Sequence, residues 1–210
     1  MKRNPHYLVL DIETAPQDNP DKYVLDYFQE RKWSKGGVKA DREEMDRIIE
    51  PTLAQVICIC LKSGDDIEKF YQDKDHTEEM IISDFWETIQ AVYEQYSKLT
   101  LVTFNGLAFD IPFIETRSAI LGIGRSVDLP RRKYDFISHF DVRMALTDWD
   151  VRGYGDLYFW GHVFKIPIDD EIITSDKVVE YYQKGKIIPV VDHCVQDVTV
   201  TEALYLKLTH

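Results

Sequence analysis

Long apolar runs are missing from this sequence of 210 residues. No stretch approaches the roughly 20 apolar residues that a helix needs to span a bilayer. The first residues, MKRNPHYLVLDIET, carry two basic side chains, but their apolar run is short and soon meets acids, unlike a secretory signal. We therefore expect a cytoplasmic protein that does not contact a membrane.

Cysteine is also scarce, with only Cys58, Cys60 and Cys194 in the chain. This number and spacing match neither a disulfide framework nor a zinc site. Cys58 and Cys60 lie two positions apart in QVICICLK and therefore share one face of an expected strand. We interpret all three as small apolar core residues in a reducing compartment.

Basic residues are outnumbered, since 25 Lys and Arg stand against 37 Asp and Glu and give a formal net charge of −12. This balance argues against a protein that coats duplex DNA through overall positive charge. It does not exclude nucleic acid at a single site, because carboxylates gathered around bound cations present positive charge to a phosphate. We find no internal repeat and expect one domain over residues 1–210.

The apolar pattern predicts strands and helices around one mixed sheet, which is an α/β fold. Strands are expected at 7–12, 54–62, 66–71, 100–104 and 137–142, with a hairpin turn at residues 63–66. Helices are expected at 78–96, 110–121, 157–164, 175–182 and 191–208.

The segment of about residues 15–50 is long for a connection, polar and mixed in charge. Short helices are expected at Tyr23–Lys32 and Asp41–Ile49. Two interpretations stay open: a plain surface insertion, or a flap that contacts a polymeric substrate.

Asp11 and Glu13 lie two positions apart at the end of the first apolar strand, so both carboxylates project from one face. Two neighbouring carboxylates are costly to bury unless a cation binds them. Oxygen-only sites of this kind suit Mg²⁺ or Mn²⁺. Alone, this pair is a weak signal.

Two further acids stand in recognisable surroundings. Asp110 follows an Asn-Gly turn and begins a helix, where it is either an N-cap or a metal ligand. His193 and Asp197 lie four positions apart on the last helix and so share a face. Alternatively, these two are a surface or capping histidine and a solvated acid.

Taken together, LDIET, NGLAFDIP and HCVQD resemble the three signatures of the DEDD superfamily of 3′→5′ exonucleases: Asp-x-Glu, Asn-x₃-Phe-Asp, and Tyr-x₃-Asp or His-x₄-Asp. The chain is most similar to stand-alone proteins that resemble the exonuclease domain of family B DNA polymerases. The resemblance covers most of residues 7–208 and is weakest at 15–50. It implies an RNase H-like mixed five-stranded sheet flanked by helices.

The resemblance also implies the chemistry. Two divalent cations, Mg²⁺ or Mn²⁺, would be held by Asp11, Glu13, Asp110 and Asp197, and nucleoside 5′-monophosphates would be released from single-stranded 3′ ends. DNA is the favoured substrate. The alternatives are an exoribonuclease, or a catalytically weakened module of the same fold that only binds nucleic acid. A replication or repair partner would act in trans.

The sequence departs from the family pattern at His193. The branch it most resembles has Tyr at this position, and the other branch places His one position earlier, where this chain has Asp192. Three interpretations stay open. His193 replaces the Tyr as the group that orients or deprotonates the attacking water, a nearby Tyr from a loop has that role, or the site is catalytically weakened. We favour the first, because imidazole titrates near neutral pH. Tyr181 and Tyr182 are expected on a separate helix.

Substrate contacts are expected from residues next to these motifs. Arg131 and Arg132 belong to the strongest local basic cluster, which contacts phosphate or is simply a solvated loop. Aromatic side chains can stack on unpaired bases. The expected substrate-binding residues are Thr14, Asn105, Gly106, Leu107, Phe109, Arg131 and Arg132.

Overall fold

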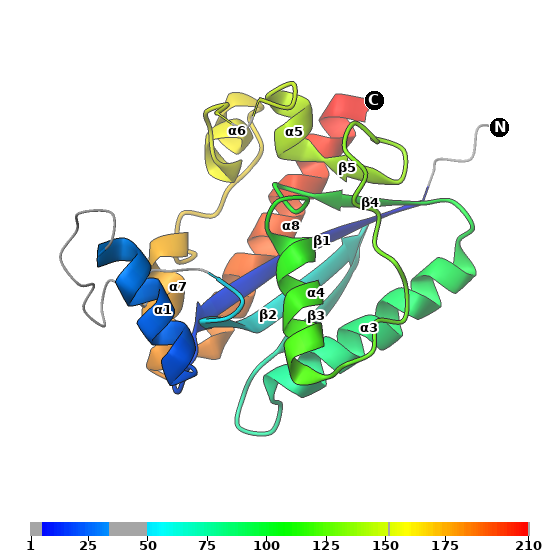
Figure 1. Ribbon diagram of the computed structural model, residues 1–210. Coiled ribbons are helices and arrows are strands. Elements are labelled where there is room, and N and C mark those ends of the chain that lie inside the picture. Colours follow the sequence, from blue (N-terminus) through cyan, green and yellow to red (C-terminus); the bar gives the residue numbers. More distant parts are fainter. Residues whose placement is uncertain (1–5, 34–49, 151, 210) are drawn as a thin grey trace.

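Five strands form one mixed sheet in the order β3-β2-β1-β4-β5 (Figure 1). The computed structural model describes residues 6–33, 50–150 and 152–209, apart from the side chains of residues 31–33. β1 pairs antiparallel with β2 and β2 antiparallel with β3, whereas β1–β4 and β4–β5 are parallel. The predicted mixed sheet is confirmed. The strands are β1 (His6–Pro16), β2 (Ala54–Ser63), β3 (Asp66–Tyr71), β4 (Leu99–Thr103) and β5 (His139–Asp141).

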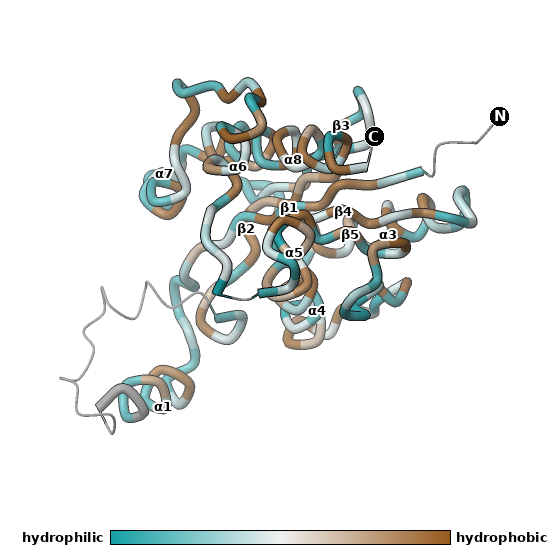
Figure 2. Tube along the Cα trace, turned by 90° about the horizontal axis from the view of Figure 1, so that it is seen from above, coloured by the Kyte–Doolittle hydropathy of each residue, from teal (hydrophilic) through white to brown (hydrophobic). Residues whose placement is uncertain are grey.

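Helices cover both faces of the sheet, as Figure 2 shows from above. One face packs against α3 (Glu78–Gln95) and α4 (Asp110–Leu121). The other packs against α5 (Val142–Leu146), α6 (Leu157–Val163), α7 (Val178–Gln183) and α8 (Ile187–Thr209), with a 3₁₀ turn at Ser175–Lys177 before α7. Because both faces are covered, nearly every position of β2 is buried.

The alternation of side chains along β1 decides which residues meet which helix layer. Leu8, Leu10 and Ile12 point into the core formed with α3 and α4. Val9 points into the opposite core, formed largely with α8. Since side chains alternate with period two, Asp11 and Glu13 project to the same side as Val9, toward α8.

Most predicted elements are confirmed, with differences at their ends. β1 does not end at Ile12 but runs to Pro16, because antiparallel pairing with β2 continues to Ala54. α8 begins at Ile187 rather than 191, since Pro189 is tolerated in a first turn that needs no N–H donor. The expected strand at 137–142 is only His139–Asp141, because Asp141 caps the unpredicted helix α5.

The segment of residues 15–50 is partly described. α1 (Lys22–Trp33) confirms the helix expected at Tyr23–Lys32, and it packs through Val24, Leu25 and Phe28 against Leu53. Figure 2 shows α1 standing apart from the two helix layers. The helix expected at Asp41–Ile49 lies outside the described residues.

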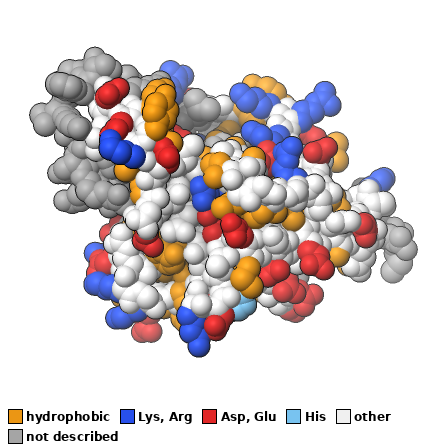
Figure 3. Space-filling model, turned by 60° about the horizontal axis from the view of Figure 1, so that its bottom comes forward, with side chains coloured by type: hydrophobic (Ala, Val, Ile, Leu, Met, Phe, Trp, Pro, Cys, Tyr) orange, Lys and Arg blue, Asp and Glu red, His pale blue; other side chains and the backbone are white. Residues whose placement is uncertain are grey.

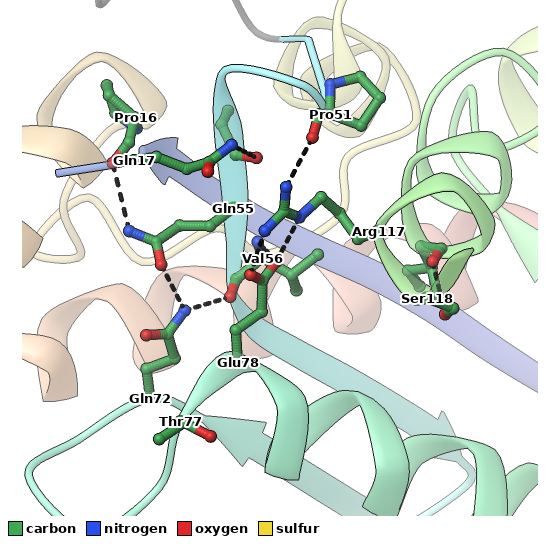
Figure 4. Close-up of polar contacts among 12 residues, drawn as sticks. Pro16, Gln17, Pro51, Gln55, Val56, Gln72, Thr77, Glu78, Arg117 and Ser118 are labelled. Carbon is green, nitrogen blue, oxygen red and sulfur yellow. Dashed lines mark hydrogen bonds and ion pairs between the residues drawn. The ribbon is translucent and has the colours of Figure 1, made fainter. Parts of the chain in front are cut away.

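A buried ion pair joins the helices of one layer to the sheet (Figure 4). Arg117 of α4 donates to both carboxylate oxygens of Glu78 at 2.8 and 2.6 Å and to the carbonyl oxygen of Pro51 at 2.8 Å. Glu78, at the start of α3, also accepts from the backbone N–H of Val56 on β2 at 2.7 Å. These bonds fix the start of α3 and the middle of α4 against the same end of β2.

In the part of the chain that the structure describes, no helix has the length and apolar character required to cross a bilayer.

Candidate active site

The first acidic pair lies in the middle of the sheet. On β1, Asp11 is opposite Cys60 of β2 and Glu13 is opposite Cys58. The register shifts between Glu13 and Thr14, where pairing skips Ile57 of β2. Such bulges bend a strand and re-aim its side chains. Asp11 and Glu13 remain partly exposed although their neighbours Leu10 and Ile12 are buried.

The turn between β4 and α4 brings the third acid to this pair. Asn105 has a positive φ of 68°, which asparagine tolerates better than most residues. A Cβ on Gly106 would lie 2.5 Å from the side chain of Thr103, so only glycine fits there. The buried carboxylate of Asp141 accepts from the N–H groups of Asn105 at 3.0 Å and Leu107 at 3.1 Å. This turn fixes where α4 begins.

Asp110 is not the N-cap of α4, so that interpretation is wrong. The cap position is Phe109, which makes no side-chain cap bond. The Asp110 carboxylate instead accepts from the backbone N–H of Ile12 at 3.1 Å. This bond ties the first turn of α4 to β1 between Asp11 and Glu13.

α8 supplies the remaining two groups. His193 Nε2 lies 3.6 Å from a carboxylate oxygen of Glu13 and 3.9 Å from one of Asp197. The His193 residue is fully buried, at 0% exposure, which rules out the surface-histidine interpretation. Asp197 is only partly exposed. All five expected catalytic residues therefore gather where β1, α4 and α8 meet.

The four carboxylates perturb one another. Burial raises the pKa values of Asp11 and Glu13 well above their ordinary range, and the charges of Asp197 and Asp110 raise them further. Burial raises the pKa of Asp110 to about 7 and also raises that of Asp197. Without a cation, the folded protein favours protonated forms of these acids.

The donor atoms fit a divalent cation. Glu13, His193 and Asp197 each offer one ligand atom, and these atoms lie within 4.8 Å of one another. Asp11, Glu13 and Cys194 form a second such group, so Glu13 belongs to both. Carboxylate-rich sites suit hard ions such as Mg²⁺ and Mn²⁺.

Tyr158 belongs to the site, and the sequence reasoning did not include it. Its hydroxyl donates to an oxygen of the Asp197 carboxylate and lies 3.3 Å from His193 Nδ1. Burial and the negative charge of Asp197 raise the Tyr158 pKa. The helix over Leu157–Phe164 was predicted almost correctly, but no sequence pattern indicates that it packs on α8. Tyr181 and Tyr182 lie on α7, a separate helix as expected.

Ser175 completes the surroundings of His193. Its hydroxyl lies 3.2 Å from Nε2, so both ring nitrogens have polar neighbours. If the Tyr158 hydroxyl donates to Asp197, it accepts from His193 Nδ1–H. In that arrangement Nε2 faces the carboxylates of Glu13 and Asp197, at 3.6 and 3.9 Å.

The expected substrate-binding residues have different surroundings. Thr14, Asn105, Leu107 and Phe109 are partly exposed next to the acids in the chain, whereas Gly106 is buried. Arg143, which the sequence reasoning missed, donates to the Asn105 side-chain oxygen and to the Gly153 carbonyl oxygen, both at 3.2 Å. 

The basic cluster before β5 is at the surface. Arg131 pairs with Glu115 of α4 at 2.6 Å, and Arg132 is exposed. In Figure 3, acidic and basic side chains are interspersed over the described surface that faces the viewer. This mixture agrees with the absence of bulk positive charge in the sequence.

Comparison with known proteins identifies what the chain resembles. Residues 46–210 match the family described as "Predicted 3'-5' exonuclease related to the exonuclease domain of PolB". The fold is similar to that of a family B DNA polymerase from the hyperthermophilic archaeon Pyrobaculum calidifontis, with a TM-score of 0.67 and 18% sequence identity. The match covers 98% of this chain but only 25% of the polymerase chain. The expected RNase H-like fold is thereby confirmed. None of the curated proteins matches.

Proposed function

The chain belongs to the family of predicted 3′–5′ exonucleases related to the exonuclease domain of PolB, and from this premise we propose that it shortens single-stranded nucleic acid from the 3′ end, with DNA as its favoured substrate. One observation carries the proposal. Carboxylates from three separate parts of the chain meet in one largely buried cluster, where the charges of Asp110 and Asp197 raise the pKa values of Asp11 and Glu13. In a protein that binds no cation, nothing offsets the free-energy cost of burying these neighbouring carboxylates.

The same four acids hold the metal in this proposal. Asp11, Glu13 and Asp197 bind one Mg²⁺ or Mn²⁺, and Asp110 helps to bind a second. When bound, such ions supply Lewis-acid stabilisation of the phosphate and a more acidic attacking water. The bond from Ile12 N–H to Asp110 holds that carboxylate beside the other two on β1.

We assign the proton transfer to His193. Its Nε2 faces Glu13 and Asp197, so it is the ring atom placed toward the acids. Nε2 takes a proton from the attacking water as the water oxygen bonds to phosphorus and the bond to the 3′-oxygen breaks, and the departing 3′-oxygen takes a proton from solvent. The product is a nucleoside 5′-monophosphate.

Tyr158 is a positioning residue in this proposal. Its hydroxyl contacts both His193 Nδ1 and Asp197, so it fixes the imidazole ring relative to the carboxylate. The partner of the second ring nitrogen commonly sets the tautomer of a functional histidine.

The nucleotide at the 3′ end lies against the Asn105–Phe109 turn in this proposal. Arg143 fixes the Asn105 side chain there and brings positive charge close to the turn. Tyr154 and Phe159, 75% and 42% exposed, lie on either side of Tyr158 in the sequence and contact each other. Exposed rings of this kind stack on unpaired bases, which favours single strands.

The direct test uses 5′-labelled oligonucleotides of matched DNA and RNA sequence with Mg²⁺ or Mn²⁺. We expect a ladder of products shortened one nucleotide at a time from the 3′ end, faster for DNA. Faster cleavage of RNA identifies the exoribonuclease alternative. Tight binding with no shortening supports the weakened binding module and contradicts the proposed activity.

A further inference from the structure

Three thiols meet directly behind the acidic cluster. Cys58 and Cys60 project from β2 toward α8, and Cys194 projects from α8 toward them. The sulfur atoms of Cys58 and Cys60 are 4.0 Å apart, and all three sulfurs lie within 4.8 Å of one another. All three residues are fully buried, at 0% exposure, and none forms a disulfide. The sequence indicates that Cys58 and Cys60 lie together, but it does not indicate that Cys194 packs against them.

We propose that this cluster, Cys58, Cys60 and Cys194, binds one thiophilic d¹⁰ metal ion of the Cu⁺ class through three thiolates. Three sulfurs in a plane around an ion at about 2.3 Å lie about 4 Å from one another, which follows from the metal–sulfur distance of zinc sites. The 4.0 Å separation of Cys58 and Cys60 already matches this value.

Three ligands favour an ion that accepts trigonal coordination. Structural Zn²⁺ takes four ligands, and no fourth side chain joins the three thiols as a group among the residues with described positions. Soft thiolates select soft ions, whereas the neighbouring carboxylates select hard ones. Binding breaks three S–H bonds, releases the protons to solvent and forms three metal–sulfur bonds, with no change of oxidation state.

The thiols adjoin the acidic cluster, whose Asp11 is partly exposed. The Cys194 sulfur lies 3.4 Å from a carboxylate oxygen of Asp11 and 3.6 Å from its carbonyl oxygen. An ion bound to the carboxylate of Asp11 would therefore lie next to the Cys194 thiol. The inference does not rest on the proposed function, because it needs only the positions of the three sulfurs.

The test is a titration of Cd²⁺ into the reduced full-length protein with excess Mg²⁺ present. Cd²⁺ bound to thiolate gives an ultraviolet charge-transfer absorption that Cd²⁺ bound to carboxylate does not. The chain has only three cysteines, so any such absorption comes from this cluster. We expect saturation at one Cd²⁺ per chain, together with a higher melting temperature because the ion binds the folded state.

Variants assign the ligands. Cys58→Ala, Cys60→Ala and Cys194→Ala should each weaken Cd²⁺ binding at least ~10-fold, the smallest loss expected even for a group that only supports a ligand. Asp197→Asn should keep the thiolate absorption, because Asp197 does not belong to the cluster of three cysteines. Absence of the absorption in the wild-type protein, or an absorption accompanied by a lower melting temperature, would overturn the proposal and leave the thiols as packing residues only.

Discussion

At the scale of single residues, the proposed function depends most on Asp110 of α4 and Asp197 of α8. Asp110 is buried and bonded to the backbone of β1, and Asp197 faces His193 and Tyr158. Neither environment is that of a solvated surface acid. Helix capping does not account for their position, and in the proposed function a shared cation does.

We predict that Asp197→Asn lowers turnover at least ~10²-fold, the scale for loss of a group that acts through electrostatic stabilisation. The amide has the same size but cannot supply a charged oxygen to the metal. The matched control is Asp192→Asn, which changes an exposed acid on the same helix and should leave turnover unchanged. Equal rates for both variants in the oligonucleotide assay would show that Asp197 is not a ligand.

His193 and Tyr158 can be distinguished by their kinetics. His193→Gln should lower kcat about 10²-fold with little change in KM, because Gln cannot accept the proton. Tyr158→Phe should lower kcat by only ~10-fold, as expected for a supporting group. The reverse order of effects would assign the proton transfer to Tyr158.

At the scale of elements, the turn before α4 positions Asp110. Gly106→Ala places a Cβ 2.5 Å from Thr103, whose hydroxyl contacts both His139 and the Gly106 N–H. We predict a loss of about 1–3 kcal/mol in the free energy of unfolding, the usual cost of overpacking, together with lower turnover. Gly124→Ala has nothing within 4 Å of the new Cβ and serves as the control, with an effect within about 0.5 kcal/mol. Denaturant unfolding of both variants checks this.

The Glu78–Arg117 pair makes a separate prediction about stability. Arg117→Met leaves the buried Glu78 carboxylate with the Val56 N–H as its one remaining hydrogen-bond donor among the described residues, so the free energy of unfolding should fall by about 3–5 kcal/mol. Arg125→Met breaks a pair with Glu115 in which the arginine side chain is 46% exposed, and should cost at most about 1 kcal/mol. Similar losses for the two variants would mean that burial of the first pair is unimportant.

Sequence reasoning predicted elements better than it predicted contacts between them. The period of the apolar residues in α3 and the β-branched run in β2 are local signals, so both elements were identified within a residue or two. α5 was missed because five residues are too short to show a helical period. Contacts of Tyr158 with Asp197, or of Cys194 with Asp11, join residues that no local pattern connects. The four acids of the candidate site were singled out only because their motifs resemble those of a family, and Arg143 had no such motif.

At the scale of the whole molecule, the acidic cluster couples stability to pH. Asp110 has an ordinary pKa of 3.8 and a folded-state pKa of about 7. Between these values the folded state binds more protons than the unfolded state, so the free energy of unfolding of the metal-free protein falls as pH rises. The raised pKa values of Asp11, Glu13 and Asp197 act in the same direction.

We predict that the melting temperature in a chelator decreases between about pH 5 and pH 7.5. Mg²⁺ or Mn²⁺ should raise the melting temperature, and the gain should increase with pH because protons no longer compete for the carboxylates. Asp110→Asn in chelator should show a shallower decrease than the wild-type protein. A melting temperature that rises over this range in chelator would contradict the description of the cluster.

In the proposed function, acids from β1, α4 and α8 together hold divalent cations, and calorimetric titration of Mn²⁺ into the metal-free protein at neutral pH is the decisive experiment. We expect saturable binding of two ions per chain, retained in Asp192→Asn and lost or strongly weakened in Asp197→Asn. Absence of Mn²⁺ binding to the wild-type protein, or equal binding by Asp197→Asn, would contradict it.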